Sequence, residues 1–346
     1  MGDTRYLRRA IELALPHRTH PNPRVGAVVV DAADEVIGEG AHLGQGQDHA
    51  EVVALEQAGP KARGATLYVT LEPCSHHGRT PPCVDAVVTA GVARVVVGVV
   101  DTDPKVSGSG IDLLRNAGIE VATGVMELEA EAVDPGYFRQ RRSGLPRIIL
   151  KYAMTLDGSV AAEDGSSKWI TGEEAREDSH RLRSEVDAVA VGAGTLRSDN
   201  PSLTVRHGRT DHQPRPIVIA GSGDLPPEAR IWERGPLVVA AGKKAVPSGE
   251  LAIVEGQDGM PLPEAVAKEL AERGYYDVLL EGGPTIAGAW WQAGIVTEGV
   301  IYLAGKIGGG TGVGPLGGIF ASLSDAVDVP IKGVRVVGDD IRIDFG

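Results

Sequence analysis

The stretch Ala65-Thr-Leu-Tyr-Val-Thr-Leu-Glu-Pro-Cys-Ser-His-His-Gly-Arg-Thr-Pro-Pro-Cys83 contains the only two cysteines of this chain of 346 residues. Its first seven residues are rich in apolar and β-branched side chains and predict a strand, and a helix is predicted over Cys83–Ala90. Two cysteines commonly form a disulfide or remain buried thiols. A disulfide is disfavoured because the start of the chain does not resemble a secretory signal. Metal ligation has to be judged from the residues nearby.

A second motif, His49-Ala50-Glu51, opens a predicted helix upstream of the cysteines. Together with Cys74 and Cys83 it supplies one imidazole and two thiolates. Three protein ligands leave the fourth tetrahedral position of a zinc ion to water, which is the arrangement of a catalytic site. Zinc would lower the pKa of that water to about 7, and Glu51 would accept its proton and pass it to a departing amine. The pattern predicts a zinc deaminase.

Other interpretations of these residues stay open on spacing alone. A His-x-Glu sequence at a helix start often serves only in capping or solvation. The eight residues between Cys74 and Cys83 make a longer gap than the usual Cys-x-x-Cys of deaminases. His76 and His77 lie within that gap and are rival ligands to the second cysteine.

The pattern on either side of these motifs indicates a sheet covered by helices. Helical spacing over residues 3–15 stops at Pro16, and the order of predicted elements after it is typical of an α/β fold. The other elements expected in this half are strands at Val25–Asp31, Glu35–Glu39, Ala65–Leu71 and Arg94–Val100.

A domain boundary is predicted near Pro146, where the charged stretch Arg139–Pro146 ends in turn formers. We therefore expect two domains, residues 1–146 and 147–346. The second is predicted as another α/β domain ending in a β-hairpin over Val334–Asp344. Its other expected elements are strands at Arg147–Tyr152, Ala188–Val191, Pro216–Ala220, Leu237–Ala241 and Asp277–Leu280 and helices at Glu173–Glu185 and Pro263–Arg273.

Composition and charge narrow the functional classes. Apolar residues make up 42% and charged residues 23%, which is typical of folded globular proteins. The formal charge of −13 is shared, because residues 1–146 hold 14 basic and 19 acidic residues and residues 147–346 hold 20 and 28. Acidity in both halves disfavours nucleic-acid binding. The chain has no run of about 18 apolar residues, so we do not expect a membrane span. We expect a cytoplasmic protein.

Two glycine-containing segments of the second half admit more than one interpretation. Leu279–Thr285 runs from a strand into a helix and could hold a phosphate on backbone N–H groups, or could be only a tight turn. Gly305–Gly318 has eight glycines in fourteen residues, which favours a mobile surface loop over a phosphate cradle. Arg183 and Arg206 could bind a ribose phosphate or be merely solvated.

The first half resembles the deaminase half of bifunctional riboflavin biosynthesis proteins, both in Glu72–Cys83 and in Thr19-His-Pro-Asn-Pro-Arg-Val-Gly26. In that family the long cysteine gap is normal. The resemblance implies a cytidine-deaminase-like α/β/α domain, with Glu51 in proton transfer and zinc on His49, Cys74 and Cys83. It also suggests Asn22 for the pyrimidine pocket, although Asn22 could instead serve only an Asn-Pro turn. Weaker pocket candidates are His42, His76, Arg79, Asp101 and Lys105.

The second half resembles the reductase half of the same family, which is similar to dihydrofolate reductase in fold. The resemblance rests on Lys151–Gly158, Ser167–Thr171, Val191–Thr195, Asp199–Arg206 and Glu281–Thr285. It implies NADPH contacts at Ala153, Trp169, Thr195, Asp199, Gly283, Pro284, Thr285, Ile286, Ala287, Gly288 and Ala289. It implies substrate contacts at Ser167, Arg183, Leu203, Arg206 and Glu281.

The reactions implied by the resemblance are two steps on one small molecule. A diaminopyrimidinone ribotide loses an exocyclic amino group, and NADPH then reduces its ribosyl side chain to ribityl, with Lys151 or Asp157 assisting proton movement. A homo-oligomer, dimer or larger, is expected.

One alternative is a deaminase of free nucleosides or bases with an inactive second half. Another is a zinc-stabilised binding protein, whose metal site would be closed by a fourth protein ligand.

Overall fold

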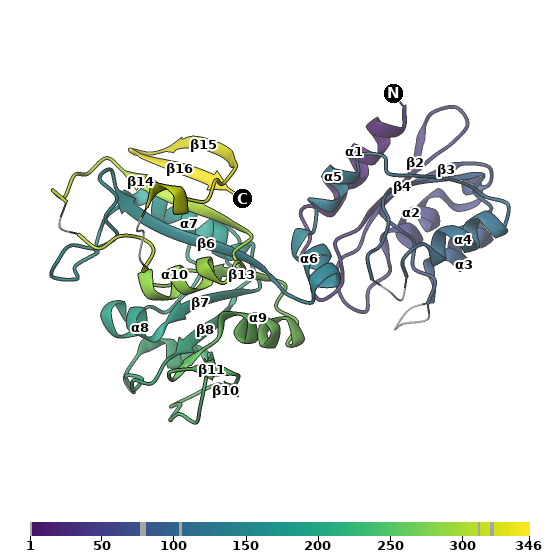
Figure 1. Cartoon of the computed structure of the whole chain (residues 1–346). Helices are drawn as coiled ribbons and strands as arrows, with labels where there is room; N and C mark the ends of the chain where they lie inside the picture. Colours follow the sequence, from purple (N-terminus) through teal and green to yellow (C-terminus); the bar gives the residue numbers. More distant parts are fainter. Residues whose placement is uncertain (1, 77–80, 104–105, 311, 319–321) are drawn as a thin grey trace. The chain divides into compact units, whose positions relative to one another are not determined.

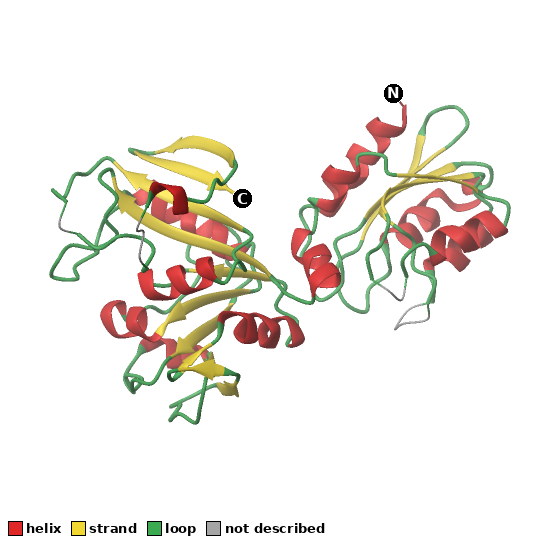
Figure 2. Ribbon diagram, in the orientation of Figure 1, coloured by secondary structure: helices red, strands yellow, loops and turns green. Residues whose placement is uncertain are grey.

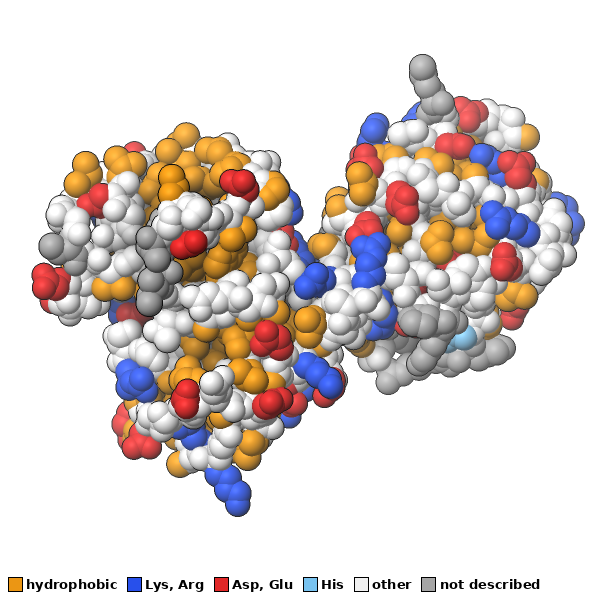
Figure 3. Space-filling model, in the orientation of Figure 1, with side chains coloured by type: hydrophobic (Ala, Val, Ile, Leu, Met, Phe, Trp, Pro, Cys, Tyr) orange, Lys and Arg blue, Asp and Glu red, His pale blue; other side chains and the backbone are white. Residues whose placement is uncertain are grey.

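The computed structural model describes residues 2–76, 81–103, 106–310, 312–318 and 322–346. Contacts divide the chain into two compact units, Met1–Ser143 and Gly144–Gly346, each with its own sheet and helices (Figures 1 and 2). Among the described residues, no helix combines the length and the apolar character needed to cross a membrane. On the face shown in Figure 3, acidic and basic side chains are interspersed over both units.

The first unit is built on a five-stranded sheet in the order β2-β1-β3-β4-β5. Strand β1 pairs antiparallel with β2 and β3, whereas β3, β4 and β5 run parallel. The parallel strands therefore end at one edge, where the loops after β3 and β4 meet. The strands are β1 (Gly26–Val30), β2 (Val36–Ala41), β3 (Thr66–Leu71), β4 (Arg94–Val99) and β5 (Glu120–Thr123).

Helices cover both faces of this sheet (Figure 1). Tyr6 and Leu7 of α1 pack with Val28 and Val96 in one apolar cluster on one face of the sheet. The residues next to these in each strand face the opposite layer, because side chains alternate along a strand. On the other layer α2 lies very close to β2, because a Cβ added at Gly40 would stand 2.2 Å from the carbonyl oxygen of Ala50. The helices are α1 (Gly2–Ala14), α2 (Ala50–Ala58), α3 (Cys83–Ala90), α4 (Ser109–Asn116), α5 (Glu127–Glu131) and α6 (Pro135–Ser143), with a 3₁₀ turn η1 (Gly59–Ala62).

The second unit contains a nine-stranded sheet in the order β10-β9-β8-β7-β13-β6-β14-β16-β15. The strands from β10 to β14 are parallel, and the hairpin β15–β16 joins β14 antiparallel at the edge. The strands are β6 (Arg147–Thr155), β7 (Ala188–Gly192), β8 (Arg215–Ala220), β9 (Leu237–Ala240), β10 (Glu250–Ile253), β13 (Asp277–Leu280), β14 (Glu298–Ala304), β15 (Ile331–Val337) and β16 (Asp340–Phe345), with a separate pair β11 (Gly256–Gln257) and β12 (Met260–Pro261).

Two apolar clusters lie on the two faces of the larger sheet. Ile149 and Leu279 face the layer that contains α7 and α8, whereas Ile148 and Leu280 face α9 and α10. Neighbouring residues of one strand thus serve opposite layers, which is typical of a parallel sheet covered on both sides. The helices are α7 (Glu173–Ser184), α8 (Ala193–Asp199), α9 (Pro263–Glu272) and α10 (Pro284–Gln292), with 3₁₀ turns η2 (Arg230–Arg234) and η3 (Leu323–Asp325).

Most predicted elements are confirmed, and the helix expected at Cys83–Ala90 is α3 with the same bounds. The first part of the charged stretch that predicted the domain boundary is helical, because Arg139–Ser143 forms the end of α6. This helix was missed because arginines dominate its sequence, although Tyr137 and Phe138 bury their rings. Strand β5 was missed because it lies at an edge with only partial burial and has no apolar alternation.

Candidate active sites

Three metal-binding side chains converge in the first unit, as the sequence predicted. His49 is the N-cap residue of α2, Cys83 is the first residue of α3, and Cys74 follows β3. Nδ1 of His49 lies 2.9 Å from Sγ of Cys83 and 3.5 Å from Sγ of Cys74, and the three donor atoms lie within 4.8 Å of one another. One imidazole and two thiols at this separation fit zinc and leave a coordination position for water.

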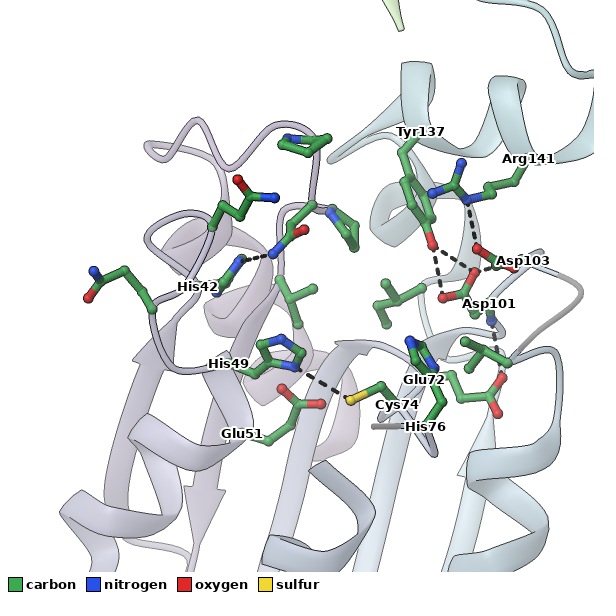
Figure 4. A pocket seen from close by; sticks show the side chains of 18 of the residues that line it. His42, His49, Glu51, Glu72, Cys74, His76, Asp101, Asp103, Tyr137 and Arg141 are labelled. Atoms are coloured by element: carbon green, nitrogen blue, oxygen red, sulfur yellow. Dashed lines mark hydrogen bonds and ion pairs between the residues drawn. The ribbon is translucent and has the colours of Figure 1, made fainter. Parts of the chain in front are cut away.

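Close contact shifts the ionisation of the two thiols in opposite directions, because the hydrogen bond with Cys74, followed by burial, raises the pKa of Cys83. The thiol of Cys83, with the imidazole of His49, lowers the pKa of Cys74 to about 4. Glu51 is 3% exposed, and burial, followed by the charge of Cys74, raises the pKa of its carboxyl to about 7. A bound divalent cation would favour the carboxylate. Glu51 lies beside the donors in Figure 4 and is not part of the three-donor group. It is therefore placed to exchange protons.

A cavity of about 280 Å³ opens above this cluster. Asn22 and His42 line it, and Nδ2 of Asn22 lies 3.0 Å from Nε2 of His42. Burial lowers the pKa of the His42 imidazole, which contacts His49 edge to face. The cavity is of a size that holds a small heterocycle.

The far wall of the cavity consists of residues that the sequence analysis missed or ranked low. The hydroxyl of Tyr137 on α6 donates to both carboxylate oxygens of Asp101, at 3.0 and 3.1 Å, and Arg141 pairs with Asp103 at 2.9 Å (Figure 4). Asp101 was a weak candidate, whereas Tyr137, Arg141 and Asp103 had no motif to mark them. Only the packing of α6 brings them to the pocket.

Glu72 is another residue that the sequence analysis missed, and it has a clear structural role. Its buried carboxylate accepts hydrogen bonds from the backbone N–H groups of Gly108 and Gly110, each at 2.9 Å. It thereby ties the metal-binding turn to the start of α4. Its place next to Pro73-Cys74 was the only signal that could have drawn attention to it.

The remaining candidates of this half have mixed outcomes. His76 lines the cavity but is not in the three-donor group, so the geometry favours Cys83 over this rival. His77, Arg79 and Lys105 lie outside the described residues.

In the second unit, several candidate cofactor contacts lie at the carboxyl ends of neighbouring parallel strands. Ala153 is near the end of β6, Thr195 follows β7 in α8, and Gly283 follows β13 as the N-cap residue of α10. A Cβ added at Gly283 would lie 3.5 Å from Oγ1 of Thr195. This edge of a parallel sheet is where cofactors commonly bind, and the N–H groups of α10 offer partial positive charge.

A buried ionic cluster joins three candidate residues beside this edge. Arg183 on α7 makes a bidentate pair with Glu281, at 2.6 and 2.8 Å, and Nζ of Lys151 lies 3.7 Å from the same carboxylate. Burial opposes ionisation of Glu281, but Arg183 and then Lys151 lower its pKa to about 2. Burial lowers the pKa of Lys151. This lysine is therefore a better proton donor than an ordinary surface lysine.

Arg206 lies next to this cluster. Its guanidinium is 3.0 Å from Nε2 of His180, and its backbone N–H donates to Nδ1 at 3.3 Å. The carbonyl of Thr204, which follows the buried Leu203, accepts from Arg183 at 3.2 Å. His180 is a buried residue that the sequence analysis missed.

Other candidates lie on the loops around the sheet edge. Trp169 is 63% exposed, with the Arg176 guanidinium 4.8 Å from its ring, and Ser167 lies in the same loop. Nζ of Lys168 donates to the carbonyl of Asp199 at 3.3 Å. These contacts place the loop beside the end of α8.

The described residues of the glycine-rich segment form a largely exposed loop, as expected, and hydrogen bonds attach this loop to the rest of the unit. Asp157 accepts from the N–H groups of Gly308 and Gly309, at 3.0 and 2.8 Å. Gly317 donates to the carbonyl of Pro284 at 2.8 Å, beside the start of α10. Asp157 thus anchors this segment, which makes Lys151 the better candidate for proton movement.

Models of two protein families match the chain. The C-terminal domain of RibD matches residues 146–343, and the zinc-binding region of cytidine and deoxycytidylate deaminases matches residues 1–99.

Close relatives match both halves at once. RibD of Aquifex aeolicus is 42% identical and RibD of Escherichia coli 39% identical, each over 99% of this chain and 98% of the relative. A solved structure of RibD from Acinetobacter baumannii has a TM-score of 0.91 at 36% identity. A Thermotoga maritima diaminohydroxyphosphoribosylaminopyrimidine deaminase/5-amino-6-(5-phosphoribosylamino)uracil reductase has 0.88 at 34%. Both cover 99% of this chain and 98% of the other.

Proposed function

This chain belongs to the RibD family of riboflavin biosynthesis proteins, and we propose that its two units perform successive steps on one pyrimidine ribotide. The protein is a bifunctional enzyme, a deaminase and a reductase. The first unit would remove an exocyclic amino group from the diaminopyrimidinone ring, and the second would reduce the ribosyl side chain to ribityl. The observation that supports the first step best is the convergence of His49, Cys74 and Cys83 beside the buried Glu51.

The deamination exchanges a C–N bond for a C–O bond. Zinc held by His49, Cys74 and Cys83 would make a water molecule acidic enough to react at neutral pH. Glu51 would accept a proton from the water whose oxygen bonds the ring carbon, and would return a proton to the amine that leaves as ammonia. Burial raises the pKa of the Glu51 carboxyl, and a bound cation would favour the carboxylate, which is the form that accepts a proton. Asn22 binds the edge of the pyrimidine.

The reductase step uses a nicotinamide cofactor, and we propose NADPH. It would supply a hydride for the first carbon of the opened sugar. We assign cofactor contacts to Ala153, Trp169, Thr195, Asp199 and the start of α10 with its N-cap residue, Gly283–Ala289. Substrate contacts are assigned to Ser167, Arg183, Leu203, Arg206 and Glu281.

Charge supports this division of the second site. Arg183 already has a carboxylate partner in Glu281, whereas the contact of Arg206 is with an imidazole. Arg206 can therefore offer its charge to the ribotide phosphate, and Lys151 can supply a proton to the reduced sugar. Two expectations stay predictions. One is that the protein forms a homo-oligomer, and the other is that the two parts of the chain on either side of Pro146 fold independently.

A coupled assay on the full chain tests the proposal. Zinc-loaded protein and the diaminopyrimidinone ribotide should release ammonia without NADPH, and NADPH added afterwards should be oxidised. Glu51→Gln should prevent both when the starting ribotide is supplied, yet oxidise NADPH normally with the deaminated ribotide. Deamination of free nucleosides at an equal rate, or no NADPH oxidation with the deaminated ribotide, would contradict the proposal and favour the nucleoside deaminase instead.

A further inference from the structure

We propose that His42 orients the side-chain amide of Asn22, so that Oδ1 of Asn22 faces the deaminase pocket as a hydrogen-bond acceptor. The pocket would then select heterocycles that present a ring N–H donor at this point. This inference rests on the proposed deamination of an aminopyrimidine and adds the part of the site that recognises the ring. His42 acts through Asn22 and is a positioning residue.

The tautomer of His42 follows from its partner on the protein side. Nδ1 of His42 lies 3.0 Å from the backbone carbonyl oxygen of Asp48. A carbonyl oxygen can only accept, so Nδ1 must hold the proton. In the neutral imidazole Nε2 is then an acceptor. The ring is 3% exposed, and the backbone N–H of His42 donates to the carbonyl of Val25 at 2.9 Å. Both the position and the polarity of the ring are therefore set by the protein.

The polarity of His42 determines which way the amide of Asn22 faces. Nε2 of His42 lies 3.0 Å from the terminal atom of the Asn22 amide, and an accepting nitrogen requires the NH₂ group there rather than the oxygen. Because NH₂ and oxygen lie on opposite branches of a planar amide, Oδ1 is turned away from His42. Asn22 lines the cavity, so its oxygen is the group available to a ligand.

The backbone of Asn22 is held as firmly as its side chain. The N–H of Asn22 donates to the carbonyl of Thr19 at 3.0 Å, and the hydroxyl of the buried Thr19 donates back to the carbonyl of Asn22 at 2.8 Å. The Asn22 amide therefore meets the ligand in one position, with one polarity.

This arrangement has a consequence for specificity. A free asparagine can rotate its amide by half a turn and offer a donor in place of an acceptor with almost the same shape. The hydrogen bond to His42 opposes that rotation, so a ligand that presents an acceptor would lose its partner and leave two acceptors facing each other. Sites built around a buried hydrogen bond reject analogues that lack the matching group.

The first test is spectroscopic and does not depend on activity. Zinc-loaded full-length protein with ¹⁵N-labelled histidine gives nitrogen–proton correlations that distinguish the two neutral tautomers and the imidazolium. His42→Phe identifies the His42 signals by their loss. We expect a proton on Nδ1 and none on Nε2. A proton on Nε2, in either form, would overturn the inference, because the Asn22 amide would then present its oxygen to His42.

The second test measures specificity in a double-mutant cycle. The substrates are the aminopyrimidine ribotide and its analogue methylated on the ring N–H, and the proteins are wild type, Asn22→Ala, His42→Phe and the double variant. We expect wild type to prefer the parent by roughly 100-fold or more in kcat/KM. Asn22→Ala should reduce this preference to nearly one, and His42→Phe should reduce it at least about tenfold. In the Asn22→Ala background, His42→Phe should change kcat/KM by less than about twofold.

Controls separate positioning from a structural role. Zinc content should stay near one per chain in all variants, and His17→Phe, which replaces a histidine of the same unit outside the cavity, should match wild type. If His42→Phe lowers kcat/KM equally for both substrates, or keeps its effect without Asn22, His42 does not act by orienting the amide. If wild type releases no ammonia from the ribotide, the proposed function fails, whereas the tautomer measurement still decides the orientation of Asn22.

Discussion

The two candidate sites are built in different ways. The zinc site places three donor side chains and one carboxylate at the ends of a strand and two helices of the first unit. The reductase site gathers its residues from three parallel strands and the loops and helices beyond them. A metal site depends on a few side chains of strict identity. A cofactor site depends more on backbone shape and on charge distributed over a sheet edge. A single substitution in the zinc site should therefore abolish its activity, whereas a single substitution in the reductase site should weaken binding or activity only in part.

The largest effect is expected at Cys74. Cys74→Ala leaves two protein ligands, too few for a stable zinc site, and should abolish both metal binding and deamination. Reduction of the deaminated ribotide should remain within about twofold of wild type, because the candidate reductase residues all lie in the other unit. Metal analysis and separate assays of the two steps measure this. A large loss of reduction in a folded protein would show that the two sites depend on each other.

A smaller but still large effect is expected at Glu51. Glu51→Gln removes a proton acceptor without removing a ligand, so about one zinc should remain while deamination slows at least roughly 100-fold. Ammonia release and metal content are measured on the same preparation. Turnover near the wild-type rate would assign proton transfer to another residue.

A substitution at Arg206 tests whether the loss of one side chain in the second site weakens binding only in part. Arg206→Ala removes a charge-assisted contact worth about 1.5–3 kcal/mol, which corresponds to roughly tenfold or more in ribotide affinity. Binding of NADPH should be almost unchanged. Arg209→Ala, an exposed arginine on the following loop, is the matched control. The opposite result, weaker NADPH and normal ribotide binding, would mean that Arg206 belongs to the cofactor site.

The smallest effect is a pH dependence of stability at His180. Burial, with the charges of Arg183 and Arg206, lowers the pKa of this imidazole to about 4 from the ordinary value of 6.5. Because the pKa of His180 is lower in the folded protein, the unfolded chain takes up the proton at a higher pH as the pH falls. The stability contributed by neutral His180 is therefore complete above pH 6.5 and declines as the pH falls from 6.5 to 4. Glu281, with a pKa of about 2, stays ionised across most of this window.

Tryptophan fluorescence can follow this effect in the second unit alone. All four tryptophans lie there, at positions 169, 232, 290 and 291. The urea midpoint should fall from pH 7 to pH 5, and His180→Gln, which does not take up a proton, should show a smaller fall. Equal falls in both proteins would assign the pH dependence to other groups.

Sequence patterns were sufficient where chemistry depends on residue type and order. His49, Glu51 and the cysteines could be named as candidates because few side chains bind zinc, and because they stand at strand or helix ends that local propensity predicts. The choice of Cys83 over His76 and His77 came from the resemblance, and the structure brings Cys83 together with His49 and Cys74. The alternation of apolar residues likewise predicted most strands and their division into two α/β units. Arg183 and Glu281 were named from resemblance, and the structure pairs them.

Only the tertiary structure decided which distant residues complete the sites. Tyr137 and Arg141 reach the deaminase pocket because α6 packs over it, and the contacts of His42 with Asp48 and Asn22 depend on how two loops meet. Nothing in the sequence indicated that Asp157 accepts hydrogen bonds from the glycine-rich segment, 152 residues further along the chain. Local patterns report backbone preference and side-chain chemistry, both of which are short-range. Partners far apart in the chain are set by the order of strands in each sheet, which no single segment encodes.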